Sequence, residues 1–201
     1  MTDASRPHPE RPSGIVARMD QENRFARRSP FAHLALAILF GPALGCAALA
    51  SGHKPQVGEE APPLVLDATT GSKVTLADYR GKQTVVLAFF PKAFTGGCTQ
   101  EMTNWGQVAG KLGAADAQIF GVSTDDLETQ KKFSASLKLP FPLLADPDGI
   151  AAKSYGILSA GLYAVRTTFV IGADGKVLKI VDGSAAIDPS PALEACARRK
   201  N

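Results

Sequence analysis

The chain has 201 residues, of which 45% are apolar and 20% charged, a length and composition that suit one globular domain with an extension. Its net charge is +3, and beyond residue 30 basic and acidic residues nearly balance, so no surface for nucleic acid is expected. Three cysteines are too few for a disulfide scaffold and match no zinc spacing. No histidine follows His53, which excludes Cys–His proteases and His-ligated metal sites. We expect no metal and no cofactor.

The first 50 residues divide into a polar lead and an apolar segment. Residues 1–30 are rich in Arg, Pro, Ser and Asp without apolar periodicity, which is typical of disorder. Residues 31–50 are apolar, follow three arginines and end in small residues, which is the pattern of a secretory signal. The lead is long for a signal peptide, so Met19 is a candidate for the true start. We therefore expect an exported protein, either periplasmic or anchored in the membrane and facing the periplasm.

Three fates of this segment stay open. The Ala-Leu-Ala sequence at 48–50 fits a cleavage site, and cleavage would fall after Ala50. The sequence at 43–46 is similar to a lipobox except at its first position, which makes Cys46 a candidate for lipidation. The apolar run also approaches the roughly 20 residues that span a bilayer. Residues 31–50 are therefore a candidate for membrane association, although Gly-Pro at 41–42 interrupts them.

A polar linker at 51–61 leads into a single domain at 62–201, in which strands alternate with helices. The expected strands, marked by apolar and β-branched runs, are 64–66, 74–76, 84–88, 119–123, 141–144, 167–171 and 176–181. The expected helices follow Cys98, run from Asp125 to Leu137, end near Tyr155 and cover 191–199. This order predicts an α/β fold with a mixed central sheet flanked by helices and an N-terminal β-hairpin.

Two helix boundaries rest on specific residues. Gly110 and Gly113 are expected to end the helix that follows Cys98, because glycine is common just past a helix C-terminus. Asp125 and Glu128 resemble a capping box, in which Asp125 would begin the next helix.

The stretch at 84–101 carries the most chemical information. Residues 84–88 form a continuous apolar run typical of a strand buried on both faces, and Pro91 should stop that strand. Gly96-Gly97 permits a tight loop, and Cys98 then opens a helix. Free N–H groups and a partial positive charge at a helix N-terminus favour a thiolate, which is the nucleophilic form of cysteine. Cys98 is therefore a candidate nucleophile rather than a structural thiol.

This stretch resembles the peroxiredoxin motif Pro-x-x-x-Thr-x-x-Cys, with Pro91, Thr95 and Cys98 at every required spacing. Glu101 matches the subgroup of bacterioferritin comigratory protein and peroxiredoxin Q, within the AhpC/TSA family. The resemblance runs from about Val57 to Ile180. It implies a thioredoxin-like fold and a peroxidase that reduces hydrogen peroxide and organic hydroperoxides through a sulfenic acid on Cys98.

The resemblance also suggests roles for individual side chains. Thr95 is expected to place its hydroxyl beside the sulfur, to cap the helix, or to do both. Pro91 would shield the thiolate from water. Arg166 matches the family arginine that reaches the cysteine, and its guanidinium can bind two oxygens while staying charged. Glu101 would bind that arginine, whereas Trp105 is expected to pack in the core.

Regeneration of the thiol depends on which second thiol is used. Many relatives carry a resolving cysteine five residues after the first, but Thr103 stands there. Cys196 is a possible resolving residue, although its surroundings do not resemble the family pattern. We therefore expect a one-cysteine mechanism with an external thiol, either a thioredoxin-like protein or a small thiol, in a monomer or dimer.

Two other functions are open to the same fold. A thioredoxin-like thiol-disulfide oxidoreductase normally has Cys-x-x-Cys, but Thr95 occupies the first of those positions. A non-enzymatic exported protein that binds a partner would not need Pro91, Thr95, Cys98 and Arg166 together. The sequence favours the peroxidase over both.

Overall fold

The computed structural model describes residues 52–198. The signal or anchor expected at 31–50, the candidate cleavage site and Cys46 lie outside these residues. Among the residues described, no helix is long and apolar enough to cross a membrane.

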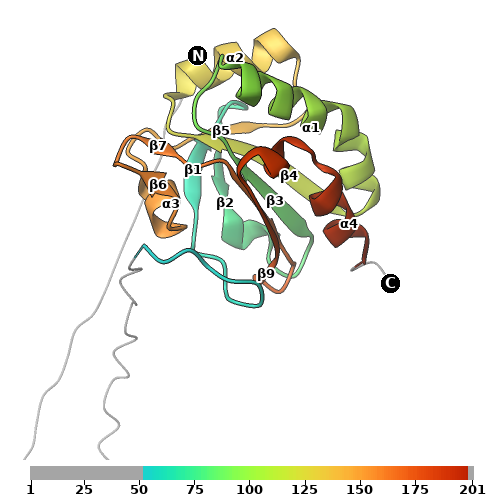
Figure 1. Cartoon of the computed structure of the whole chain (residues 1–201). Coiled ribbons are helices and arrows are strands. Elements are labelled where there is room, and N and C mark those ends of the chain that lie inside the picture. Colours follow the sequence, from blue (N-terminus) through green and yellow to red (C-terminus); the bar gives the residue numbers. More distant parts are fainter. Residues whose placement is uncertain (1–51, 199–201) are drawn as a thin grey trace, which may run out of the picture. The chain divides into compact units, whose positions relative to one another are not determined.

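Strands and helices alternate along this part of the chain (Figure 1). The strands are β1 (Val65–Ala68), β2 (Lys73–Thr75), β3 (Thr84–Phe89), β4 (Ala117–Ser123), β5 (Leu143–Ala145), β6 (Leu158–Ser159), β7 (Tyr163–Ala164), β8 (Thr167–Ile171) and β9 (Val177–Asp182). The helices are α1 (Gly96–Ala114), α2 (Leu127–Leu137), α3 (Ile150–Ser154) and α4 (Ser190–Arg198), with 3-10 turns η1 (Leu76–Tyr79) and η2 (Gly183–Ile187).

Within residues 52–198, seven strands form one mixed sheet in the order β2-β1-β5-β4-β3-β8-β9. Strands β3, β4 and β5 run parallel, and β8 pairs antiparallel with β3. The hairpins β1–β2 and β8–β9 complete the two edges. The predicted α/β fold with a mixed sheet and an N-terminal hairpin is therefore confirmed.

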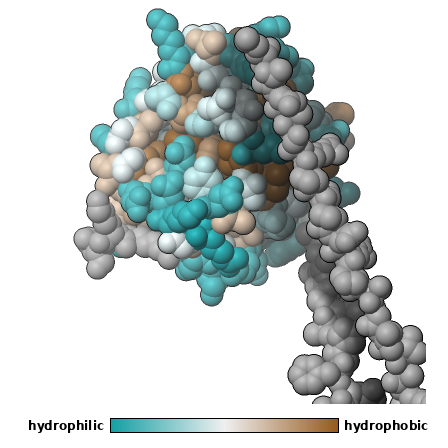
Figure 2. Space-filling view, turned by 180° about the vertical axis from the view of Figure 1, so that it is seen from behind, coloured by the Kyte–Doolittle hydropathy of each residue, from teal (hydrophilic) through white to brown (hydrophobic). Residues whose placement is uncertain are grey.

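Strand β3 separates two hydrophobic clusters, and every residue of it is buried. Val85, Leu87 and Phe89 face the cluster that contains α3, whereas Val86 and Ala88 face the one that contains α1, α2 and α4. The alternation follows from the two-residue period of a strand. Figure 2 shows that apolar surface remains in the middle of one outer face, surrounded by hydrophilic side chains.

Two predicted helix boundaries are wrong. Helix α1 passes through Gly110 and Gly113 and ends at Ala114, and the left-handed residue beyond it is Asp116, with φ 55°. Glycine inside a helix costs only about 1 kcal/mol relative to alanine, and the helix continues because Leu112 packs in the core at 1% exposure. Helix α2 is capped by Asp126, whose carboxylate accepts the Thr129 N–H, and not by Asp125.

The structure also contains short elements that the sequence pattern did not predict. The hairpin β6–β7 lies directly before β8, and η2 connects β9 to α4. Their few residues carry no clear periodicity, so neighbouring packing decides their conformation.

Candidate active site

Cys98 lies where the end of β3 leads into the first turn of α1, as the sequence predicts. The loop from Pro91 to Thr95 separates the two elements, and Cys98 is the third residue of the helix. Its side chain is almost completely buried, with 1% of its surface exposed. This places a thiol against the positive end of a 19-residue helix.

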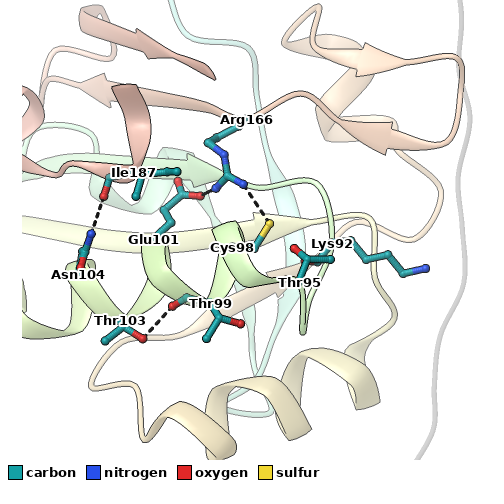
Figure 3. Close-up of polar contacts among 9 residues, drawn as sticks. All are labelled: Lys92, Thr95, Cys98, Thr99, Glu101, Thr103, Asn104, Arg166 and Ile187. Atoms are coloured by element: carbon teal, nitrogen blue, oxygen red, sulfur yellow. Dashed lines mark hydrogen bonds and ion pairs between the residues drawn. The ribbon is translucent and has the colours of Figure 1, made fainter. Parts of the chain in front are cut away.

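Arg166 lies beside Cys98 because β8 pairs with β3. Phe89 is opposite Thr167 in that pairing, so the residue just before β8 falls next to the end of β3. The Nη2 atom of Arg166 donates a hydrogen bond to the Cys98 Sγ at 3.3 Å (Figure 3). A side chain at Gly97 would approach that nitrogen to 3.2 Å, so glycine leaves room for the guanidinium.

Glu101 lies one turn further along α1 and forms an ion pair with the other guanidinium nitrogen of Arg166 (Figure 3). Its side chain is fully buried, and among the described residues its second carboxylate oxygen, Oε1, has no hydrogen-bond partner. Burial raises the pKa of Glu101 to about 8, and the effect exceeds the opposing influence of Arg166. A single cation thus lies between the sulfur and a carboxyl group that holds its proton strongly.

Thr95 occupies the N-cap position of α1 by backbone geometry. Its hydroxyl donates to the Lys92 carbonyl at 3.0 Å, and within residues 52–198 it makes no capping hydrogen bond (Figure 3). Pro91 follows β3 closely, as expected of a residue that ends a strand. It lines a groove together with Lys92, Thr124, Asp125, Leu162 and Tyr163, and Cys98 is not among the lining residues.

Cys196 lies at the other end of β3. It is 1% exposed and lines a small pocket with Lys82, Gln83 and Thr84, which precede or begin that strand. Six strand residues span about 20 Å, so the two thiols are separated by the length of β3. Both are free thiols, and burial raises the pKa of Cys196 to about 11. Trp105 is fully buried in the core, as predicted.

The comparisons with known proteins agree with this geometry. The model of the AhpC/TSA family matches residues 57–180. The chain belongs to the AhpC/TSA family. The putative peroxiredoxin bcp of Coxiella burnetii is 32% identical over 145 residues, which are 65% of this chain and 94% of that protein.

Comparison with solved structures supports the same assignment. Peroxidoxin BcpB of Mycobacterium tuberculosis matches with a TM-score of 0.67 and 30% identity, over 74% of this chain and 99% of that one. The bacterioferritin comigratory protein of Xanthomonas campestris, described with alkyl peroxide reduction activity, matches with a TM-score of 0.64 and 26% identity, over 69% of this chain and 92% of that one. The resemblance to the bacterioferritin comigratory protein and peroxiredoxin Q subgroup is confirmed, and this AhpC/TSA chain is a thiol-dependent peroxidase.

The structure adds one contact to this AhpC/TSA site that the sequence reasoning missed. Asp125 accepts a hydrogen bond from the Ala93 N–H in the loop before Cys98, at 2.8 Å. An aspartate after a strand and before a helix is typical of a helix cap, so the sequence pattern carried no signal for this contact.

Replacing Glu101 is expected to change how folding stability depends on pH. A carboxyl whose pKa rises from 4.5 to about 8 on folding stabilises the fold fully below pH 4.5, and this contribution is lost as the pH rises through 8. Between these values the free energy of unfolding of the wild type should fall more steeply than that of Glu101→Gln, by up to about 1.4 kcal/mol per pH unit. Urea unfolding from pH 5 to 8 measures both slopes.

Glu128→Gln is the matched control for this comparison. Glu128 is an exposed helix carboxylate paired with Lys131, and its replacement should leave the wild-type slope unchanged. Equal slopes for the wild type and Glu101→Gln would contradict the raised pKa.

Proposed function

We propose that Cys98 is the residue that attacks the peroxide, and that Arg166 stabilises the charge that moves during the reaction. The observation that carries this proposal is the 3.3 Å hydrogen bond from the guanidinium to the Cys98 sulfur at a helix N-terminus. A permanent cation and a helix N-terminus both favour the thiolate over the thiol.

In the proposed step, the Cys98 thiolate attacks the hydroxyl oxygen of a hydroperoxide. A new S–O bond forms, the O–O bond breaks, and the other oxygen leaves as hydroxide or alkoxide, which then takes a proton. The transferred oxygen keeps its hydrogen, so Cys98 becomes a sulfenic acid. Negative charge moves from the sulfur to the departing oxygen, and a cation already fixed beside the sulfur stabilises that charge without rearrangement.

Glu101, Thr95 and Pro91 support this step. Glu101 is proposed to orient the guanidinium, because its carboxyl group is buried and bonded to the second guanidinium nitrogen. Thr95 is proposed to meet the peroxide through its hydroxyl, which lies at the start of α1 and would turn from the Lys92 carbonyl to do so. Pro91, which lies in the loop between β3 and Cys98, is proposed to keep water from the thiolate.

The proposed substrates are hydrogen peroxide and organic hydroperoxides, in keeping with the alkyl peroxide reduction described for the Xanthomonas campestris relative. The reductant is proposed to be an external thiol, either of a thioredoxin-like protein or of a small molecule. Two such thiols return Cys98 to its reduced form, yielding one disulfide and one water. Export of the protein, by a signal or an anchor at residues 31–50, is part of the same proposal.

Replacing Cys98 and Arg166 tests the assigned roles. Cys98→Ser should abolish peroxide consumption, because a serine hydroxyl stays protonated and is too weak a nucleophile to attack the O–O bond. Arg166→Met should lower the rate constant of Cys98 oxidation by about 10²- to 10³-fold, the effect of losing one charge-stabilising donor. Stopped-flow oxidation of the folded variants measures both effects. Equal peroxide consumption by Cys98→Ser, or an Arg166→Met rate within a few-fold of wild type, would contradict the assigned role.

We expect peroxide to convert Cys98 to a sulfenic acid that does not go on to form a disulfide with Cys196. A disulfide needs Cα atoms within about 7 Å, whereas the two residues flank opposite ends of β3. Dimedone should therefore label Cys98 after one equivalent of peroxide, and Cys196→Ser should turn over with external thiol like the wild type. Non-reducing peptide mapping that finds a Cys98–Cys196 cross-link in high yield would contradict the one-cysteine mechanism.

Export is tested by the fate of the native protein. We expect it in the periplasmic or membrane fraction, with an intact mass that corresponds to cleavage after Ala50. A diacylglyceryl mass on Cys46 would instead show that the protein is a lipoprotein. A membrane-bound product that keeps residues 31–50 would show that this segment is an uncleaved anchor. A cytoplasmic product that keeps residues 31–50 would refute export.

A further inference from the structure

The loop that leads into Cys98 is held by a side chain from another part of the chain. The Ala93 N–H donates to the Oδ2 atom of Asp125 at 2.8 Å, across 32 residues of sequence. The next residue, Phe94, has a left-handed backbone with φ 61°, a conformation that non-glycine residues rarely adopt. Its ring packs on Phe133 of α2 with centroids 5.0 Å apart. An unfavourable backbone of this kind persists only where surrounding contacts fix it.

Asp125 is itself held in place by a buried polar network. The Ser123 hydroxyl donates to the same Oδ2 atom at 2.7 Å and accepts a hydrogen bond from the Gln130 side chain at 2.8 Å. Gln130 also donates to the Leu144 carbonyl of β5. Ser123 and Gln130 are fully buried, so the network connects Asp125 to β4, β5 and α2 inside the protein.

The neighbouring Asp126 has a different task. Its carboxylate accepts the Thr129 N–H and caps α2, and its hydrogen bonds are local to that helix. Two adjacent aspartates therefore have separate functions in the fold. One begins a helix, and the other crosses to the loop before Cys98.

We propose that Asp125 is a positioning residue of the peroxidase. By fixing the Ala93 N–H, its carboxylate holds the loop in the conformation that begins α1 at Gly96 and brings Cys98 within 3.3 Å of Arg166. This inference rests on the proposed role of Cys98. Without the Asp125 contact, the loop samples other conformations, in which the sulfur leaves the guanidinium and becomes more accessible.

The test measures two reactions of Cys98 that should change in opposite directions. Asp125→Ala should lower the rate constant of Cys98 oxidation by peroxide by about 10- to 10²-fold, the effect of a small misplacement of a reacting group. It should also raise the rate at which iodoacetamide alkylates Cys98 at pH 9 several-fold. Peptide mass mapping measures this rate. A variant that lost stability but kept the native site would not show slower oxidation of Cys98 together with faster alkylation. Asp125→Asn keeps an oxygen acceptor for the Ala93 N–H and should recover most of the peroxide rate.

Asp126→Ala is the matched control. It removes a carboxylate one residue away and a helix cap, so it should lower the urea midpoint while both rates at Cys98 stay within about twofold of wild type. A wild-type peroxide rate in folded Asp125→Ala would overturn the inference, as would an equal loss of the peroxide rate in Asp126→Ala.

If Asp125→Ala does not fold, Ser123→Ala provides the test, because it removes the hydroxyl that orients the Asp125 carboxylate. Slower oxidation with faster alkylation then supports the inference, and unchanged rates overturn it.

The experiment also separates this inference from the proposed function. Oxidation is followed at Cys98 itself, so a wild type that consumes peroxide while Cys98 stays reduced overturns the proposed function and this inference with it. A wild type that oxidises Cys98 rapidly, with an Asp125→Ala variant that does so equally fast, overturns only the inference.

Discussion

The site depends on one guanidinium that bonds to a sulfur and a buried carboxyl group at the same time. Arg166 reaches Cys98 through one terminal nitrogen and Glu101 through the other. This arrangement ties the start of β8 to the first two turns of α1. It exists because β8 pairs antiparallel with β3, which places the residue before β8 beside the loop that follows β3. The sheet register therefore determines where the positive charge lies.

The balance of charge within this buried region has a chemical consequence. Cys98 and Glu101 are both acids, and a single cation bonds to both of them. If both were ionised, the region would carry a net negative charge with little access to water, which is unfavourable in a low dielectric. Burial raises the pKa of Glu101 to about 8 even though Arg166 is bonded to it, so the protein interior opposes a second negative charge beside the sulfur. The sulfur and the carboxyl group thus share one guanidinium, and burial acts against ionisation of the carboxyl group.

The sequence predicted the parts of this arrangement that local pattern determines. Strand β3 was predictable because a short, continuous apolar and β-branched run is typical of a buried strand. The motif around Cys98 then indicated the order of strand, loop and helix. The choice between Asp125 and Asp126 as helix cap was not predictable, because both residues have the same cap preference. Only the contacts of Asp125 with Ala93 and Ser123 in the folded chain distinguish them. The hydroxyl direction of Thr95 was equally unpredictable, since a rotation about one bond decides it.

The burial of Cys98 places different demands on the two halves of the proposed cycle. Because Cys98 is 1% exposed, the proposed attack of a protein thiol on its sulfur would require movement of the loop before α1, whereas a peroxide needs far less room. The same loop is held by the Asp125 hydrogen bond and by the packing of Phe94 on Phe133. In the proposed cycle, a firmer hold would favour oxidation, because it keeps the sulfur against Arg166. If the proposed reductant is a protein, a weaker hold would favour reduction, and the strength of these contacts would then decide which half of the cycle limits turnover.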